Sequence, residues 1–466
     1  MHVLPQLREI EQQWAEHVVV VGVHTGKYHA ERVTSRIREA AQRLDVAHPM
    51  VNDRQYRVWR SYAVRAWPTL VIVGPDGYVV AQHAGEYTAA MLAPVLESMI
   101  ARYSAAGALS GGSAHELTPD APAILPGTMR YPGKIAVDGQ RIAISDSGHH
   151  RVLAGKLDAS GRSMSVEQVW GDGVPGFADG DRVPDARGGP PTGELTPTVP
   201  SRDTRSSPVG AIARFNSPQG LCFDGDTLYV ADAENHAVRA IALDTGEVRT
   251  IAGTGKQLRT QADISAGAMS SPWDIVAHNG TLYVAMAGIH QLWSIDPASG
   301  QARVHSGRLG EDIVDGSHAE SLLAQPMGLA TDGRVLWFAD AESSAIRESE
   351  IDPAGGVRSL VGTGLFDFGD EDGIGDAVRL QHPQAVALHP DGRLLIADSY
   401  NDALKWLDPR TRSVTTWVRD LHEPGGLAIN TDGTVYVADT NAHRVLVLAE
   451  GGQPGELKIE GLGGSV

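Results

Sequence analysis

Aspartate and histidine recur at a fixed spacing through the second part of the chain, and both can bind metal ions or transfer protons. The aspartates end apolar segments, and histidine stands four residues after the aspartate position in several copies. These residues are Asp146, Asp232, Asp340, Asp398 and Asp439, with His150, His236, His290 and His443. A zinc site needs its ligands about 2 Å from one ion, whereas residues of separate repeats are spread around a wide circle. We therefore predict structural roles, in which the histidines stabilise turns and the aspartates accept backbone N–H bonds in the following turn.

Two further features could carry chemistry. Cys222 is the only cysteine, which excludes an intrachain disulfide and any multi-cysteine motif. Because its surroundings in sequence are apolar, we predict a buried, unreactive thiol. Carboxylates gather among glycines at residues 367–376, and calcium binds such oxygen ligands. Their spacing does not match an EF-hand, so we predict a solvated loop and leave calcium binding open.

A repeat positions these residues. A proline opens each copy, at Pro132, Pro218, Pro272, Pro326, Pro383 and Pro424. Four short strands follow each proline, the second of them ending at the aspartate position, where the third copy has Met286 instead. Radial stacking buries both faces of such sheets, so the pattern predicts a six-bladed β-propeller over residues 127–466. The outer strand of the sixth copy is expected at 457–461, and residues 183–211 are predicted to be a disordered insertion.

Residues 1–105 follow a different pattern. Leu4, Leu7, Ile10 and Trp14 mark one helix face, and helix-like segments alternate with apolar strands such as 18–23 and 69–73. This alternation predicts an α/β domain. Residues 106–126 are rich in Ala, Gly, Ser and Pro and are predicted to be a linker. The predicted fold class is therefore multidomain, with an α/β domain followed by an all-β propeller.

The charge balance restricts the partners. The chain has 39 Lys and Arg residues against 57 Asp and Glu residues, a net charge of −18. Nucleic acid and anionic membranes attract positive surfaces, so we expect neither as a partner. No apolar run is long enough for a membrane span, and the single cysteine suits a reducing compartment such as the cytoplasm. We predict no cofactor and no metal site.

The repeat resembles the NHL repeat, most clearly where Asp232 is followed by Asn235 and His236. Residues 18–100 resemble a thioredoxin-like domain of the TlpA type, in the stretches 18–24, 48–53 and 67–69. Together the two parts resemble the NHL-repeat-containing protein two family, with this chain as a bacterial member that lacks the Cys-x-x-Cys segment.

The resemblance implies a cis peptide bond at Trp67–Pro68, which in the family faces a cysteine pair and holds an incoming chain. No cysteine lies in residues 1–221, and thiol–disulfide exchange needs a thiolate. In the thioredoxin arrangement, segments 18–23 and 69–73 would flank a missing strand. We expect either that the natural start lies upstream or that another segment fills the gap.

Three functions stay open. We favour a non-catalytic binding or scaffold protein, in which a propeller face recognises a protein or a small ligand and the thioredoxin-like domain is redox-silent. The alternative is a thiol–disulfide oxidoreductase whose natural chain includes an upstream Cys-x-x-Cys motif. The third is a propeller hydrolase or metal-dependent lyase acting at the central channel, for which the sequence shows no convergent set of ligands.

Overall fold

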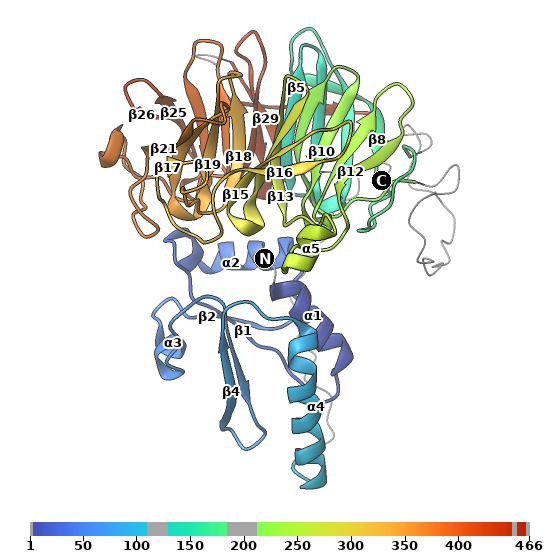
Figure 1. Cartoon of the computed structure of the whole chain (residues 1–466), viewed down its shortest axis with the longest axis vertical. Helices are drawn as coiled ribbons and strands as arrows, with labels where there is room; N and C mark the ends of the chain where they lie inside the picture. Colours follow the sequence, from blue (N-terminus) through green and yellow to red (C-terminus); the bar gives the residue numbers. More distant parts are fainter. Residues whose placement is uncertain (1–2, 110–128, 184–211, 450–453, 463–466) are drawn as a thin grey trace. The chain divides into compact units, whose positions relative to one another are not determined.

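A computed structural model describes residues 3–109, 129–183, 212–449 and 454–462. The chain divides after residue 124 into two units, which are described separately (Figure 1). The predicted linker beyond residue 109 and the predicted insertion beyond residue 183 lie outside the described residues. None of the described helices combines the length and apolar character needed to cross a bilayer.

The first unit has the predicted α/β character. Its elements are α1 (Val3–Gln13), β1 (Gly22–His24), α2 (Thr34–Arg43), β2 (Met50–Asn52), α3 (Arg57–Ser61), β3 (Thr69–Val73), β4 (Val79–Ala84) and α4 (Ala89–Ala105). The predicted face of α1 is buried where Ile10 and Trp14 pack with Leu92 and Leu96 of α4. Strand β1 pairs in parallel with β2, and β3 pairs antiparallel with β4, as two separate sheets.

The strand predicted at 18–23 is shorter than expected, because β1 begins only at Gly22. Val18 packs into the core of the unit, whereas Val19 and Val21 are 63% and 52% exposed. Within the described residues, no strand connects the β1–β2 sheet with the β3–β4 sheet. One edge of β1 and one edge of β3 therefore have no hydrogen-bonded neighbour.

The second unit is a six-bladed propeller. Blade 1 contains β5 (Pro132–Asp138), β6 (Arg141–Asp146), β7 (Arg151–Leu157) and β8 (Ser163–Trp170); blade 2 contains β9 (Pro218–Asp224), β10 (Thr227–Asp232), β11 (Ala237–Ala242) and β12 (Val248–Gly253); blade 3 contains β13 (Pro272–His278), β14 (Thr281–Met286), β15 (Gln291–Ile295) and β16 (Ala302–Ser306). A short helix, α5 (Gln261–Ser265), precedes blade 3.

The remaining blades follow the same order. Blade 4 contains β18 (Pro326–Thr331), β19 (Val335–Asp340), β20 (Ala345–Glu350) and β21 (Gly356–Val361); blade 5 contains β23 (Ala385–Leu388), β24 (Leu394–Asp398), β25 (Ala403–Asp408) and β26 (Ser413–Val418); blade 6 contains β27 (Pro424–Ile429), β28 (Val435–Asp439), β29 (Arg444–Leu448) and β30 (Gly455–Glu456). Two-residue strands β17 (Gly316–Ser317) and β22 (Gly373–Ile374) add an outer edge to blades 4 and 5.

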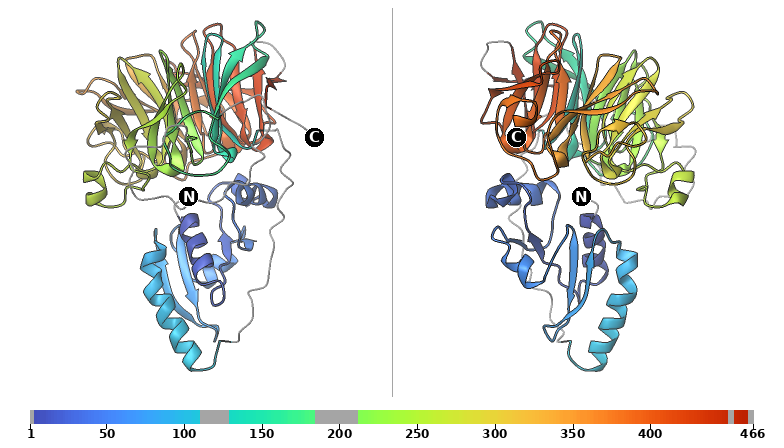
Figure 2. Two further views of the ribbon diagram at one scale, coloured as in Figure 1. Left: turned by 90° about the vertical axis from the view of Figure 1, so that its right-hand side faces the viewer. Right: turned by 60° about the vertical axis from the view of Figure 1, so that its left-hand side comes forward.

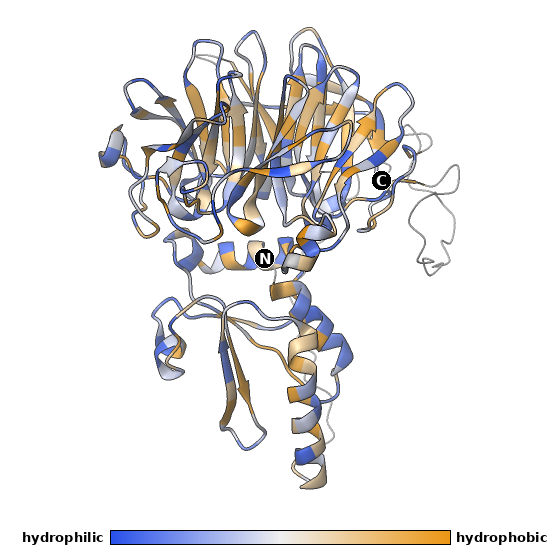
Figure 3. Cartoon of the chain, in the orientation of Figure 1, coloured by the Kyte–Doolittle hydropathy of each residue, from blue (hydrophilic) through white to orange (hydrophobic). Residues whose placement is uncertain are grey.

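The blades form a closed ring, which Figure 2 shows from the side. Each first strand contacts the first strand of the next blade, and β27 of blade 6 returns to β5 of blade 1. The strands are mostly apolar and the turns hydrophilic (Figure 3), because neighbouring sheets bury each other's faces. A buried cluster spanning blades 6 and 1 includes Tyr436, Ile142 and Leu457.

The end of the chain corrects one prediction. Residues 457–461 are not the outer strand of blade 6, because that strand is β30. Leu457 is buried between blades 6 and 1, and the chain then crosses to blade 1, where β31 (Lys458–Glu460) pairs in parallel with β8. The crossing thus adds strand pairing to the closure of the ring.

The five repeat aspartates are fully buried, and each accepts a backbone N–H bond of 2.6–2.8 Å. The donors are Arg130, Asn216, Ala324, Gln381 and His422. The predicted partner was therefore wrong: the donor lies before the first strand of the same blade rather than in the following turn. The carboxylate is placed for this contact because the first two strands are antiparallel, which brings the end of the second beside the start of the first.

Each buried aspartate also has a cation on the third strand of its blade. Arg151 and Arg444 stand five residues after the aspartate, and Arg239, Arg347 and Lys405 stand seven residues after it. Burial raises the pKa of Asp232 and of Asp398 to about 6, so both remain ionised at neutral pH. The cations offset the cost of burying these charges.

Blade 3 lacks both charges. Met286 takes the aspartate position and is fully buried, and Trp293 takes the position of the cation. The indole Nε1 of Trp293 donates to Gln291 at 2.9 Å, and Gln291 donates to the carbonyl of Gly307 at 2.8 Å. In blade 3, an apolar side chain and a hydrogen-bonded indole thus replace both members of the ion pair. The change at Met286 is accompanied by a change at Trp293.

The predicted turn histidines join neighbouring blades. They take left-handed backbone conformations, as do Ser344 and Asp402 at the equivalent positions of blades 4 and 5. Nδ1 of His150, His236 and His443 accepts a bond of 3.0–3.1 Å from the backbone N–H of Ser217, Ser271 and Tyr131, each one residue before the next blade's first strand. His290 shares the backbone conformation, with φ of 57°.

The contact between blades 3 and 4 contains a pair of histidines. The rings of His305 and His318 lie 4.7 Å apart, and Nε2 of His305 lies 3.1 Å from the carbonyl oxygen of Glu350. The hydroxyl of Ser306 lies 2.8 Å from Nδ1 of His318, but Ser306 is fully buried. Burial and the neighbouring His318 lower the pKa of His305 to about 4. The two histidines are partly buried, and the lowered pKa keeps His305 neutral at neutral pH.

The ion pairs predict a strong asymmetry between single and double substitutions. Arg347→Met leaves the carboxylate of Asp340 buried without a cation, which should lower the free energy of unfolding by about 3–5 kcal/mol. The double variant Asp340→Met/Arg347→Trp copies blade 3 and should lose clearly less. Chemical denaturation followed by tryptophan fluorescence measures both, with Arg249→Met at an exposed site on β12 as the control. A double variant as unstable as the single one would contradict this explanation.

The histidine pair predicts a loss of stability on acidification. Between pH 6.5 and about 4, unfolded chains bind a proton at residue 305 that the folded protein excludes. From pH 7 to pH 5 this linkage removes about 2 kcal/mol. The raised pKa values of Asp232 and Asp398 act in the opposite direction, so the comparison is between the protein and its His305→Gln variant, which should lose about 2 kcal/mol less. A His305→Gln variant that loses as much stability between pH 7 and pH 5 as the unsubstituted protein would contradict the assignment.

Candidate functional site

The sequence-predicted residues of the repeat form the framework of the propeller. The five aspartates and four histidines hold turns and neighbouring segments, and none of them lines a cavity described below. Within residues 3–109, 129–183, 212–449 and 454–462, no cluster of three or more His, Cys, Asp or Glu side chains is arranged to hold a metal ion.

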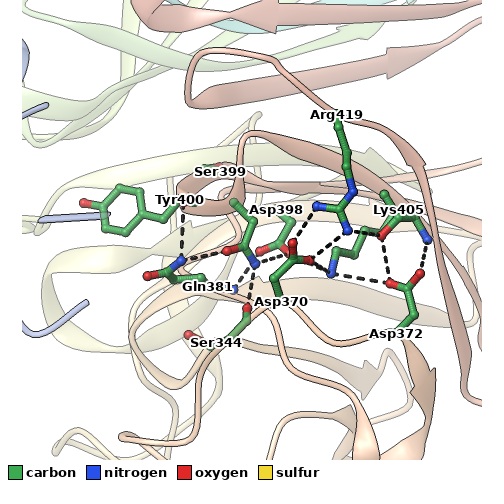
Figure 4. A network of polar contacts seen from close by, with 12 residues as sticks. Ser344, Asp370, Asp372, Gln381, Asp398, Ser399, Tyr400, Lys405 and Arg419 are labelled. Carbon is green, nitrogen blue, oxygen red and sulfur yellow. Dashed lines mark hydrogen bonds and ion pairs between the residues drawn. The ribbon is translucent and has the colours of Figure 1, made fainter. Parts of the chain in front are cut away.

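The acidic loop contains carboxylates that already have cations (Figure 4). Nζ of Lys405 lies 2.6 Å from Asp370, 3.3 Å from the repeat residue Asp398 and 3.5 Å from Asp372. Arg419 pairs with Asp370 at 2.5 Å. Burial opposes ionisation of both residues, but Arg419 and Lys405 lower the pKa of Asp370, and hydrogen bonds from Thr416, with a further contribution of Lys405, lower the pKa of Asp372. The ammonium group of Lys405 thus contacts two carboxylates of the loop and the repeat residue Asp398.

In other blades too, the segment that leads into the first strand contains an Asp-Gly pair, and its aspartate pairs with the cation of the third strand. Asp179 and Asp315 pair with Arg239 and Arg347 at 2.8 and 3.0 Å. Asp315 and Asp372 each stand eleven residues before the repeat proline, and Asp179 stands 39 before it, in the interval that contains residues 184–211. The sequence analysis missed these contacts, although the recurring Asp-Gly pairs are a signal that could have revealed them.

Cys222 and Pro68 occupy their predicted elements. Cys222 lies on β9, the innermost strand of blade 2, and burial raises its thiol pKa to about 12. The thiol is therefore protonated at neutral pH and a poor nucleophile. The Trp67–Pro68 peptide bond is cis, and the Trp67 indole donates to the carbonyl of Thr25 at 2.8 Å and packs on Trp59 with ring centres 4.6 Å apart.

The axis of the propeller is crossed by a buried lysine. Lys134, on the first strand of blade 1, donates to the carbonyl of Gln384 at 2.5 Å and lies 3.6 Å from Asp274 of blade 3. Asp274 in turn accepts the N–H of Leu329 in blade 4. Lys134 thus links blade 1 to blades 3 and 5, and Asp274 extends the contact to blade 4.

A cavity of about 790 Å³ lies among blades 4, 5 and 6. Its walls include the turns at 332–334, 389–392 and 430–431, which join the first and second strands of these blades, and the turn at 409–412 of blade 5. In Figure 1 such turns lie at the end of the propeller opposite α5. The arginines of the cavity are Arg334, Arg358, Arg410 and Arg412, against the acidic residues Asp332 and Glu348.

Two of these arginines are held in place by the wall. Glu348 is buried; it accepts the indole N–H of Trp337 at 3.2 Å and pairs with Nε of Arg358 at 2.5 Å. This hydrogen bond to Glu348 raises the pKa of Arg358, whose side chain is still 69% exposed. Nε of Arg412 donates to the carbonyl of Leu360, and its guanidinium pairs with Asp376, both at 2.6 Å.

The other two arginines have no such partner. Within the part of the chain that the structure describes, the guanidinium groups of Arg334 and Arg410 form no ion pair. Asp332 lies beside Arg334, but its carboxylate accepts the backbone N–H groups of Arg334 and Val335 at 2.8 and 2.9 Å. The cavity therefore presents unneutralised guanidinium groups, which suit carboxylate and phosphate oxygens. The sequence analysis did not find this site, because its residues come from separate repeats.

Known protein families match both units. Residues 1–79 match the thioredoxin-like family, and residues 215–241 and 421–448 match the NHL repeat. Among solved structures, an inactive virginiamycin B lyase from Staphylococcus aureus covers 72% of this chain and 86% of its own, at 11% identity and a TM-score of 0.42.

Two curated relatives match nearly the whole chain. Protein SUPPRESSOR OF QUENCHING 1, chloroplastic, from Arabidopsis thaliana is 35% identical over 95% of this chain and 42% of its own length. NHL repeat-containing protein 2 from Gallus gallus is 34% identical over 96% of this chain. The chain spans 64% of that relative's length. With a thioredoxin-like domain followed by an NHL-repeat propeller, the chain belongs to the family of NHL repeat-containing protein 2.

Proposed function

We propose that the propeller is a non-catalytic binding module for a small anionic molecule, which binds in the cavity among blades 4, 5 and 6. The charge of the cavity wall carries the proposal. Four guanidinium groups line the cavity with two carboxylates. Glu348 pairs with Arg358 and Asp376 with Arg412, so Arg334 and Arg410 supply the excess positive charge, although the whole protein has a net charge of −18. A local excess of arginine in an acidic protein favours an anionic ligand over a cationic or apolar one.

Part of the site is preorganised for such a ligand. Glu348 holds Nε of Arg358, and the carbonyl of Leu360 holds Nε of Arg412. The remaining N–H groups of each guanidinium are still available, because each arginine carries five donors. Fixing these side chains before binding reduces the conformational entropy that a ligand must otherwise offset. Arg334 and Arg410 then complete the wall from the turns of blades 4 and 5.

The proposal assigns no reaction to these 466 residues. Cys222 is the only cysteine and its pKa is raised to about 12, so we propose that the thioredoxin-like domain is redox-silent here. We also propose a cytoplasmic location, which the single cysteine supports. The net charge of −18 supports the absence of nucleic-acid and membrane partners.

Isothermal titration of the whole chain with citrate, and separately with inorganic phosphate, tests the site. We expect citrate to bind, and Arg334→Ser/Arg410→Ser to weaken its affinity by about tenfold or more, because two charge-assisted contacts are lost. The matched control is Arg249→Ser, an exposed arginine on β12 outside the cavity, which should leave the affinity within about twofold. The proposal fails if neither anion binds, or if the control weakens citrate as much as the double variant.

A further inference from the structure

A second cavity, of about 310 Å³, lies next to the first. His389 lines both cavities and so forms a wall between them. The second cavity is lined mainly by blade 5, with Trp406 and Trp417 on two neighbouring strands and Thr415 beside them. Gly433, of the blade 6 turn, completes it; a Cβ at Gly433 would lie only 3.0 Å from Nε2 of His389.

The two tryptophans form an angled aromatic platform. Their ring centres lie 5.1 Å apart with an angle of 38° between the planes. Arg393 lies over the ring of Trp406, with 4.4 Å from the guanidinium to the ring centre, and Asp391 fixes Arg393 at 2.7 Å. No guanidinium or ammonium group covers the Trp417 ring within the described ranges. Trp417 therefore supplies the ring on which a ligand can stack.

The indole N–H groups of this platform differ from those of three of the four other tryptophans in the propeller; that of Trp273 likewise has no protein acceptor among the described residues. Trp170, Trp293 and Trp337 each donate their indole N–H to a protein acceptor. No protein acceptor receives the indole N–H of Trp406 or Trp417 among the residues that the structure describes. A tryptophan normally finds a hydrogen-bond partner when its ring is packed, so these two donors are available to a ligand in the cavity.

We propose that the two cavities form one site for an acidic saccharide. The oxyanion, a uronic acid carboxylate or a sugar phosphate, binds the arginines of the first cavity. A sugar ring stacks on Trp417 in the second cavity, and its hydroxyl groups meet the indole N–H groups and the hydroxyl of Thr415. This inference rests on the proposed function, since the first cavity supplies the anion site.

The geometry favours a sugar over a nucleobase. A base is flat on both faces and is held best between parallel rings, whereas the planes of Trp406 and Trp417 meet at 38°. A sugar ring has one apolar face for the platform and polar groups around its rim. The polar residues that line this cavity beside the two tryptophans are His389, Arg393, Thr415 and Thr416, which can meet the hydroxyl groups of a sugar.

The test is a set of titrations of the whole chain with trigalacturonate, glucose 6-phosphate, uncharged maltotriose and adenosine monophosphate, beside citrate and phosphate. We expect at least one acidic sugar to bind about tenfold more tightly than its anion alone. Trp417→Ala should remove that gain and leave citrate binding unchanged, and Trp417→Phe should keep most of it because the aromatic face remains. Trp67→Ala, at a tryptophan of the thioredoxin-like domain, is the matched control and should change neither affinity. A gain in affinity for trigalacturonate over citrate would identify a carboxylate as the anion. A gain for glucose 6-phosphate over inorganic phosphate would identify a phosphate.

Several outcomes would overturn the saccharide site. These are an acidic sugar that binds no more tightly than its anion, a Trp417→Ala variant that binds the sugar as the unsubstituted chain does, or tighter binding of adenosine monophosphate than of either acidic sugar. Maltotriose binding as tightly as trigalacturonate would also overturn it, because the arginines would then contribute nothing. Citrate binding that persists in these cases leaves the proposed function standing, whereas absent citrate binding removes the anion site itself.

Discussion

The propeller depends on a carboxylate buried at the end of the second strand of five blades. A short four-stranded sheet gives little to fix the segment that leads into it, and a buried charge must be compensated or it destabilises the fold. The aspartate meets both needs, because one oxygen accepts the N–H of the lead-in segment and the other faces an arginine or lysine of the third strand, as Asp232 does with Asn216 and Arg239. In these five blades, the lead-in segment and the third strand are therefore both held by one residue.

This structural constraint determines which side chains remain available to bind a ligand. The histidines and aspartates that first suggested chemistry are committed to hydrogen bonds within and between blades, as His443 is with Tyr131. Side chains that remain available to a ligand occur at positions where one repeat differs from another. In blade 5, Arg393 of the Asp-Gly-Arg turn pairs with Asp391 at 2.7 Å. In blade 4, Asp332 of the same motif accepts backbone N–H groups, and its Arg334 keeps its charge uncompensated.

The sequence could predict the features that all repeats share, but not those that depend on how the repeats pack. The number of blades, the boundaries of most strands and the structural nature of the repeat residues follow from a pattern that recurs in every copy. The path of residues 457–461 could not be predicted in this way, because β31 pairs with a strand whose partner residues lie 295 positions earlier in the sequence, as Lys458 does with Ser163. The cavity is equally hidden, because Arg334, Arg358 and Arg410 meet only once blades 4 and 5 are stacked.

A positive cavity in a strongly acidic protein is physically consistent, because the two charges act over different distances. At physiological ionic strength, charges separated by more than about 8 Å are largely screened, so most of the net charge of −18 is not felt inside the cavity. Direct contacts with guanidinium groups act within hydrogen-bond distance and are screened much less. The acidic surface then slows the approach of every anion, while the arginines decide which of them stays bound. Because the acidic surface repels all anions and only short-range contacts retain them, the cavity should favour an anion that has an additional binding group, such as a ring that stacks.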